Sequence, residues 1–103
     1  MVPFETVWAY LQANLEAGTI IRNWTLMHGY LGDTMKVVAV RGNSIEIEAP
    51  NAENIQVVPK EDFEKLWDVW SDYKSRTLKR NELRELTRFS KYIISILHWY
   101  ENA

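Results

Sequence analysis

Residues 90 to 102 constrain the fold most, because a helix formed by this segment is apolar over most of its circumference. Its polar residues make one narrow line, which consists of Lys91, Ser95, His98 and Asn102. Its other large residues are apolar or aromatic: Tyr92, Ile93, Ile94, Ile96, Leu97, Trp99 and Tyr100. A helix with this distribution is buried inside a fold or contacts a partner. The chain must therefore surround the segment on several sides or share it with another molecule.

The residues before this segment predict a short helix at 81 to 86, and Ser90 is a candidate N-cap for the longer helix at 90 to 101. The sequence leaves open whether the two form one bent helix or two. A short helix followed by a Ser-capped one resembles the helix-turn-helix family, which implies contact with DNA. Two positions depart from the family pattern, since Arg84 stands where a small residue is expected and Arg88 where the turn favours glycine.

Two further segments repeat apolar residues every three or four positions, which is the period of an amphipathic helix. In residues 3 to 17 the repeat consists of Phe4, Val7, Trp8, Leu11 and Leu15. In residues 60 to 73 it consists of Phe63, Leu66, Trp67, Trp70 and Tyr73. Acidic residues crowd the first turn of the second segment and complement the helix dipole. We therefore predict one helix over each segment.

The residues between these helices are typical of a small sheet. We predict a strand at 19 to 25, followed by a loop or turn at 26 to 33, which holds two glycines and an Asp. Residues 35 to 40 and 44 to 49 predict a β-hairpin around a Gly42-Asn43 turn.

The second arm of this hairpin alternates isoleucine with glutamate, which predicts a sheet with one wet face. Pro50 and the polar residues after it are expected to end the arm. Residues 55 to 58 then predict a fourth strand, most simply antiparallel to the third.

These elements define an α+β fold over residues 1 to 103 as a single domain. It has an N-terminal helix, a small antiparallel sheet of three to four strands and two to three C-terminal helices. A hydrophobic content of 47% and the absence of cysteine indicate a core stabilised by packing alone. We expect a cytoplasmic protein, because the chain lacks a signal peptide pattern and an apolar run long enough to span a membrane.

The charge is divided unequally along the chain. Residues 1 to 73 carry five Lys or Arg against eleven Asp or Glu, whereas residues 74 to 103 carry seven against three. Arg80, Arg84 and Arg88 recur every four residues, with Lys91 following, and this spacing predicts a basic line along one side of a helix. The line either contacts nucleic acid, or it stays solvated and pairs with acidic groups such as Glu82, Glu85 or the acidic first part of the chain.

Few residues suggest catalysis. His28 lies with Asp33 in the predicted loop, and an enzyme that uses these two side chains is a remote alternative to a polar turn. No catalytic, phosphate-loop or metal-binding motif occurs, so we expect no enzyme, no cofactor and no metal.

Residues 55 to 97, which include IQVVPKEDFEKLW and KRNELRELTRFSKYIISIL, resemble small proteins carried as mobile gene cassettes of bacterial integrons. This resemblance implies a stand-alone bacterial cytoplasmic domain and assigns no functional residue.

We therefore expect a small soluble binding or protein-interaction module that forms a homodimer, because one small domain has little room to cover the 90 to 102 helix. The expected ligand or partner interface consists of Trp67, Trp70, Tyr92, Ile96, Trp99 and Tyr100. Its partner is a second copy, a small molecule or another protein, and no membrane is involved. The alternative is a nucleic-acid-associated regulator that uses Arg80, Arg84, Arg88 and Lys91.

Overall fold

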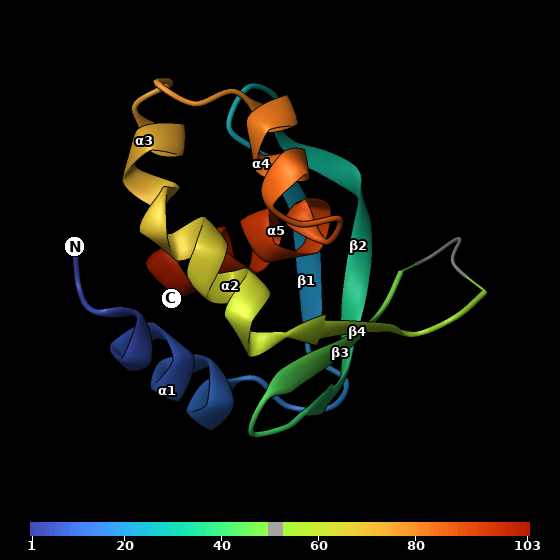
Figure 1. The fold of residues 1–103 in the computed structure, drawn as a ribbon. Helices are drawn as coiled ribbons and strands as arrows, with labels where there is room; N and C mark the ends of the chain where they lie inside the picture. Colours follow the sequence, from blue (N-terminus) through green and yellow to red (C-terminus); the bar gives the residue numbers. More distant parts are fainter. Residues whose placement is uncertain (50–52) are drawn as a thin grey trace.

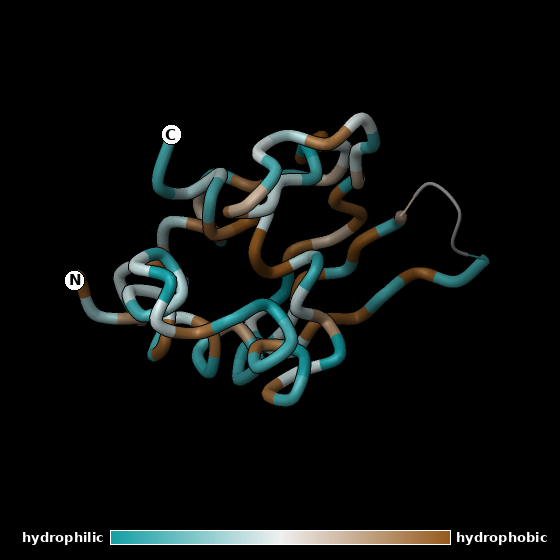
Figure 2. Tube along the Cα trace, turned by 90° about the horizontal axis from the view of Figure 1, so that it is seen from above, coloured by the Kyte–Doolittle hydropathy of each residue, from teal (hydrophilic) through white to brown (hydrophobic). Residues whose placement is uncertain are grey.

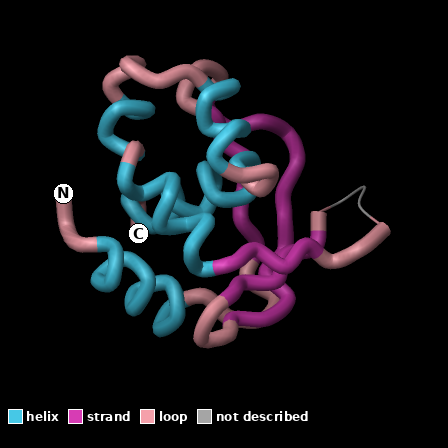
Figure 3. Tube along the Cα trace, viewed as in Figure 1, coloured by secondary structure: helices cyan, strands magenta, loops and turns pink. Residues whose placement is uncertain are grey.

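The computed structural model describes residues 1–49 and 53–103, with the helices on one side of a four-stranded sheet (Figures 1 and 3). Along the chain the elements are α1 (Phe4–Asn14), β1 (Ile20–Thr25), β2 (Gly29–Val40), β3 (Ser44–Glu48), β4 (Gln56–Pro59), α2 (Lys60–Asp68), α3 (Trp70–Lys74), α4 (Arg80–Leu86) and α5 (Ser90–Glu101). The α+β class expected from the sequence is thereby confirmed. The helical part after the sheet has four segments, where two or three were expected.

Each strand pairs with its neighbour in the sequence, so the sheet is an antiparallel meander in the order β1-β2-β3-β4. The first part of β2 pairs with β1 and its last part pairs with β3, and Lys36 takes part in both ladders. Register shifts between Arg22 and Trp24 and between Val37 and Ala39 interrupt the two ladders and bend the strands locally. In Figure 1, β3 and β4 accordingly cross the direction of β1.

The sheet buries one face against the helices. The buried side chains on that face are Ile21, Met35, Val37, Ile45, Ile47 and Val58. On the other face Glu48 is exposed, and Glu46 forms an ion pair with Arg41. The alternation of isoleucine and glutamate therefore predicted the wet face correctly. The expected strand break at Pro50 lies outside the described residues.

The loop predicted at 26 to 33 is wrong over most of its length, because β2 begins at Gly29. Gly29 pairs with Thr25, and Tyr30 pairs with Trp24, so only residues 26 to 28 form the β1–β2 turn. Gly29 has a φ of +67°, a conformation that glycine adopts without strain. This end of β2 lacks the burial alternation of a half-buried strand, because Tyr30, Leu31 and Gly32 are all exposed. Backbone pairing with β1 alone defines the strand here.

The helix predicted over residues 60 to 73 is interrupted. Val69 leaves the helical region, with φ −113° and ψ 8°, and separates α2 from α3. The apolar period continues through the break, since Trp67, Trp70 and Tyr73 are all buried. Periodicity alone therefore could not reveal the interruption.

Residues 80 to 101 form two helices, which settles the alternative that the sequence left open. Thr87 separates α4 from α5 in an extended conformation, with φ −158° and ψ 140°. Ser90 is the first residue of α5 instead of its N-cap, and no side chain caps the helix at Phe89. The hydroxyl of Thr87 instead accepts a hydrogen bond from the backbone N–H of Phe89 at 3.0 Å and donates one to Asp62 at 2.7 Å.

The core is built around α5, which contacts β1, α1, α2 and α4. Ile93, Ile94, Ile96 and Leu97 are fully buried within one chain. Hydrophobic and hydrophilic residues follow each other in short runs along the trace (Figure 2), as expected where every element has one covered side. The fold thus surrounds α5 more completely than we expected for so small a domain, and this helix does not need a second chain to cover it.

Candidate anion-binding site

A cleft of about 600 Å³ lies where the β1–β2 turn meets α4 and the connection from α3 to α4. Figure 1 shows the turn beside α4 at the top of the molecule. The apolar part of the cleft comes mainly from Leu26, Met27, Tyr73 and Leu78. Tyr73 joins the turn to α3, because its hydroxyl accepts a hydrogen bond from the backbone N–H of Leu26 at 3.2 Å. The cleft therefore has an apolar surface on which an organic group can rest.

Four cationic residues line the same cleft: Arg76, Lys79, Arg80 and Arg84. No Asp or Glu is among the described lining residues. The ion pairs found in residues 1–49 and 53–103 all involve other cations. The expectation that Arg80 and Arg84 pair with acidic groups is therefore wrong in the described part of the chain. The cleft carries a concentrated positive charge that the fold does not neutralise.

Arg80 is the most buried of these four cations. Its side chain is half-buried, and its Nε is buried without a hydrogen-bond partner among the described residues. Burial lowers the pKa of this guanidinium; the Tyr73 hydroxyl opposes that shift, and the charge of Arg84 adds to it. A buried donor that lacks an acceptor costs about 1 to 3 kcal/mol.

Arg76, which lines the cleft, has an uncommon backbone conformation. Its φ is +67°, the one positive value at a non-glycine residue in the described part of the chain. The N–H of Thr77 donates to the carbonyl of Asp72 at 2.9 Å, and the N–H of Arg76 donates to the carbonyl of Tyr73 at 3.0 Å. These two bonds close the C-terminal end of α3 in a Schellman motif, whose left-handed position usually holds glycine. An L-residue there costs on the order of 1 to 2 kcal/mol.

The four residues proposed for nucleic-acid contact are not arranged as one line. Arg80 and Arg84 line the cleft from α4. Arg88 lies after the end of α4, and its guanidinium sits over the Phe89 ring at 4.8 Å from the centroid. Lys91 is in α5 and pairs with Asp33 at 3.4 Å. The end of α4 at Leu86 breaks the four-residue repeat in space, so the expected continuous line is wrong.

The residues proposed as a partner interface lie in the core or at its margin. Trp67, Trp70 and Ile96 are buried within one chain. The rings of Trp67 and Tyr100 meet edge to face, with centroids 5.9 Å apart. Tyr92, Trp99 and Tyr100 are half-buried against the core. A partner could contact only the outer edges of these last three residues.

The polar line of α5 faces the β1–β2 hairpin. Ser95 is buried, and its hydroxyl oxygen accepts a hydrogen bond from the backbone N–H of Trp24 at 3.0 Å. The same hydroxyl donates to the side-chain oxygen of Asn23 at 3.4 Å, and Asn23 donates to Asp33 at 2.8 Å. The bond from Asn23 is the main reason that the pKa of Asp33 is lowered, with the charge of Lys91 adding to it. These residues fix the helix to the hairpin.

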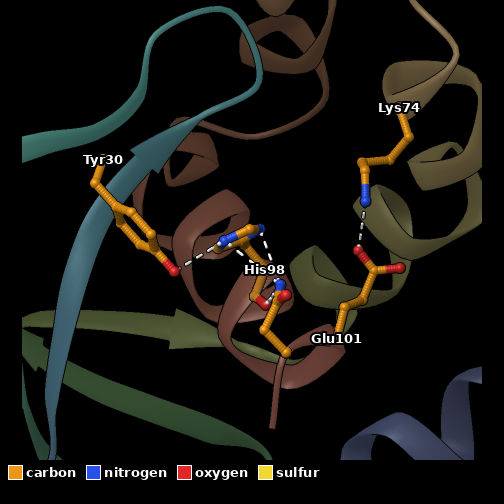
Figure 4. A network of polar contacts seen from close by, with 5 residues as sticks. Tyr30, Lys74, His98 and Glu101 are labelled. Atoms are coloured by element: carbon orange, nitrogen blue, oxygen red, sulfur yellow. Dashed lines mark hydrogen bonds and ion pairs between the residues drawn. The ribbon is translucent and has the colours of Figure 1, made fainter.

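His98 extends the same contact (Figure 4). Its ring stacks on Trp24 with a centroid separation of 3.8 Å, and its Nε2 lies 3.1 Å from the Tyr30 hydroxyl. Burial lowers the pKa of His98, and the charge of Lys74 lowers it further, while Glu101 raises it. Lys74 and Glu101 themselves form an ion pair at 2.8 Å. The neighbouring cleft measures only about 130 Å³, which is below the usual size of an organic ligand site.

The remote enzyme alternative joined His28 with Asp33. His28 is exposed in the β1–β2 turn and lines the basic cleft, whereas Asp33 is not among the described residues that line it. Asp33 is instead bonded to Asn23 and Lys91 at the α5 contact. The structure therefore assigns the two side chains to different surroundings.

Sequence reasoning included Arg80 and Arg84 among the site residues but left out Arg76, Lys79 and the apolar lining. The sequence did carry a signal for Arg76 and Lys79, since residues 74 to 79 are basic and have no helical period. The contribution of Leu26 and Met27 had no signal in the sequence, because the β1–β2 turn reaches α4 only through the tertiary fold.

Comparisons of the chain with protein-family models, with curated proteins and with solved structures found no match. Within residues 1–49 and 53–103 no group of three or more His, Asp or Glu side chains is arranged to hold a metal ion. None of the described helices is long and apolar enough to cross a membrane.

Proposed function

We propose that this chain is a small binding domain whose ligand is an organic anion held in the basic cleft. The observation that carries the proposal is the gathering of Arg76, Lys79, Arg80 and Arg84 around one cleft, with no carboxylate among its described lining residues. Guanidinium groups bind carboxylates and phosphates through two parallel, charge-assisted hydrogen bonds. A bound anion would supply the negative charge that this cleft lacks.

The apolar lining supports an organic ligand in preference to a bare inorganic ion. Leu26, Met27 and Leu78 offer a surface for hydrocarbon or an aromatic ring next to the cations. The cleft volume of about 600 Å³ falls within the range of small-molecule sites. The proposed role is binding without a chemical step, and we keep the bacterial cytosol, implied by the cassette resemblance, as the expected location.

Calorimetric titration with phenyl phosphate, benzenesulfonate and benzoate tests the proposal. We expect at least one of these anions to bind. The variant Arg80→Met should bind that anion at least tenfold more weakly, because methionine keeps much of the apolar stem and removes the guanidinium. The control is Arg88→Met, which removes a nearby arginine outside the cleft and should leave the affinity unchanged. Equal affinities of wild type and Arg80→Met, or no binding of any anion to wild type, would contradict the proposal.

A second candidate function is contact with nucleic acid. Arg88 is exposed and, like the arginines of the cleft, forms no ion pair in the described part of the chain. Binding of labelled duplex DNA at two salt concentrations tests it. Under this alternative Arg88→Met should weaken DNA binding as much as Arg84→Met does. Absence of binding at low salt removes the alternative.

The homodimer also remains a prediction. Its contact would use the outer edges of Tyr92, Trp99 and Tyr100, since the other predicted interface residues are buried in one chain. Sedimentation velocity at tens of micromolar protein tests it, and a single species with the mass of one chain would remove it.

A further inference from the structure

The left-handed backbone of Arg76 points to a specific role for this residue in the cleft. Resting on the proposed function, we propose that Arg76 contacts the ligand and that the group recognised by the cleft is a phosphate monoester carried on an organic molecule. Two independent observations support this inference: the backbone conformation of Arg76 and the charge of the cleft.

The first observation is that Arg76 occupies a position that favours glycine, and its side chain forms, among the described residues, no hydrogen bond or ion pair that offsets the cost. Its φ of +67° is the left-handed conformation in which a side chain is disfavoured. The hydrogen bond that Arg76 contributes to the end of α3 comes from its backbone N–H, which glycine also has. Its guanidinium forms no hydrogen bond or ion pair found in the described part of the chain. Arg76 is, however, one of the residues that line the cleft. Recognition of a ligand accounts for an arginine at this position, whereas packing and pairing do not.

The second observation is the amount and placement of charge. Arg76 and Lys79 come from the connection between α3 and α4, while Arg80 and Arg84 lie one turn apart on the same side of α4. A carboxylate or sulfonate would bring one negative charge to these four cations. A phosphate monoester brings a charge close to −2 and three acceptor oxygens. The dianion therefore matches cations that converge from two segments better than a monoanion does.

The apolar side of the cleft distinguishes an organic phosphate from free phosphate. Leu26 and Met27 line the same space as the cations and would remain partly uncovered by an inorganic ion. An aromatic or hydrocarbon group attached to the phosphate would cover them. A phosphodiester in nucleic acid has only one charge per phosphate and is the competing source that the experiment must separate.

The experiment is calorimetric titration at pH 8, where the phosphate carries nearly two charges. Phenyl phosphate is the main probe. Benzenesulfonate has the same ring with one charge, inorganic phosphate has the charge without the ring, and a single-stranded oligonucleotide supplies phosphodiesters. We expect phenyl phosphate to bind at least tenfold more tightly than benzenesulfonate and inorganic phosphate, and more tightly per site than the oligonucleotide.

Arg76→Gly is the decisive variant, because glycine suits the left-handed position and the variant should fold. We expect this variant to bind phenyl phosphate at least tenfold more weakly than wild type does. Its affinity for benzenesulfonate should fall much less, and its melting temperature should stay the same or rise. Arg76→Lys should retain most of the phenyl phosphate affinity, since it restores the charge. Arg88→Met is the control and should match wild type for every probe.

The outcomes separate the inference from the proposed function. If Arg76→Gly binds phenyl phosphate as wild type does while Arg80→Met has lost it, the role of Arg76 is wrong and the anion site stands. If benzenesulfonate, inorganic phosphate or the oligonucleotide binds as tightly as phenyl phosphate, the assignment of an organic phosphate monoester is wrong. If no probe binds to wild type, the proposed function fails together with the inference.

Discussion

Replacing Ser95 by alanine tests how α5 is attached to the sheet. Ser95 lies in the middle of α5 and is buried against β1. Its hydroxyl accepts the backbone N–H of Trp24 at 3.0 Å and donates to Asn23 at 3.4 Å. With this contact in place, Ser95→Ala destabilises the fold. If the polar line of α5 instead faced water, the same change would stabilise the helix, because alanine is the better helix former.

Two contributions of opposite sign determine how much the free energy of unfolding is expected to change. Loss of the hydroxyl leaves the Trp24 N–H or the Asn23 amide oxygen without its partner, and one unsatisfied buried group costs about 1 to 3 kcal/mol. The higher helix propensity of alanine returns about 0.5 kcal/mol. The free energy of unfolding should therefore fall by about 1.5 kcal/mol. For a domain of this size that corresponds to a drop in melting temperature of roughly 6 to 12 °C.

Thermal and urea unfolding followed by circular dichroism measure both quantities. The matched control is Ser71→Ala, because Ser71 is an exposed serine in α3 whose hydroxyl forms no hydrogen bond found among the described residues. We expect the control to be neutral or slightly more stable than wild type. If Ser95→Ala were as stable as the control, the attachment of α5 to the β1–β2 hairpin through its polar line would be refuted.

Two further changes test the surroundings of α5. The lowered pKa of His98 means that the unfolded chain takes up this proton first as pH falls below about 6.5. Stability should therefore be at its full value above pH 6.5 and decline below it. Urea midpoints at pH 7.5 and 5.5 should show a smaller decline in His98→Gln than in wild type, and an equal decline would contradict the assignment to His98. Thr87→Val keeps a β-branched residue that suits the extended backbone but leaves the buried N–H of Phe89 without its acceptor. We expect a loss of about 1 to 3 kcal/mol in urea unfolding, and an unchanged midpoint would show that the Thr87 hydroxyl does not stabilise the α4–α5 junction.

The accuracy of the sequence-based prediction depended on whether one face of an element is buried. The α1 stripe and the alternation of Ile45 and Ile47 with glutamates were identified because burial imposes a period on those residues. The start of β2 was missed because Tyr30 and Leu31 are exposed, so only backbone pairing marks the strand. The break at Val69 was missed for the opposite reason, since the apolar residues on both sides of it stay in phase.

The candidate site was predictable only in part. The sequence supplied the basic character of residues 74 to 91, and with it Arg80 and Arg84. It suggested one continuous line, but the end of α4 places Arg88 outside the cleft and the contact with Asp33 engages Lys91. Whether a charge is neutralised depends on neighbours that are distant in the sequence, and no local pattern reports them.

The sequence by itself determined the α+β class, the wet face of the sheet and the requirement that the 90 to 102 segment be covered on several sides, because these follow from local periods of apolar residues. The tertiary structure alone decided that one chain surrounds α5 and that the polar line of this helix attaches it to the β1–β2 hairpin. It also brought the β1–β2 turn against α4, so that basic residues and apolar residues line one cleft together. Burial of a given side chain is a local requirement, whereas the identity of the group that covers it is a property of the whole fold.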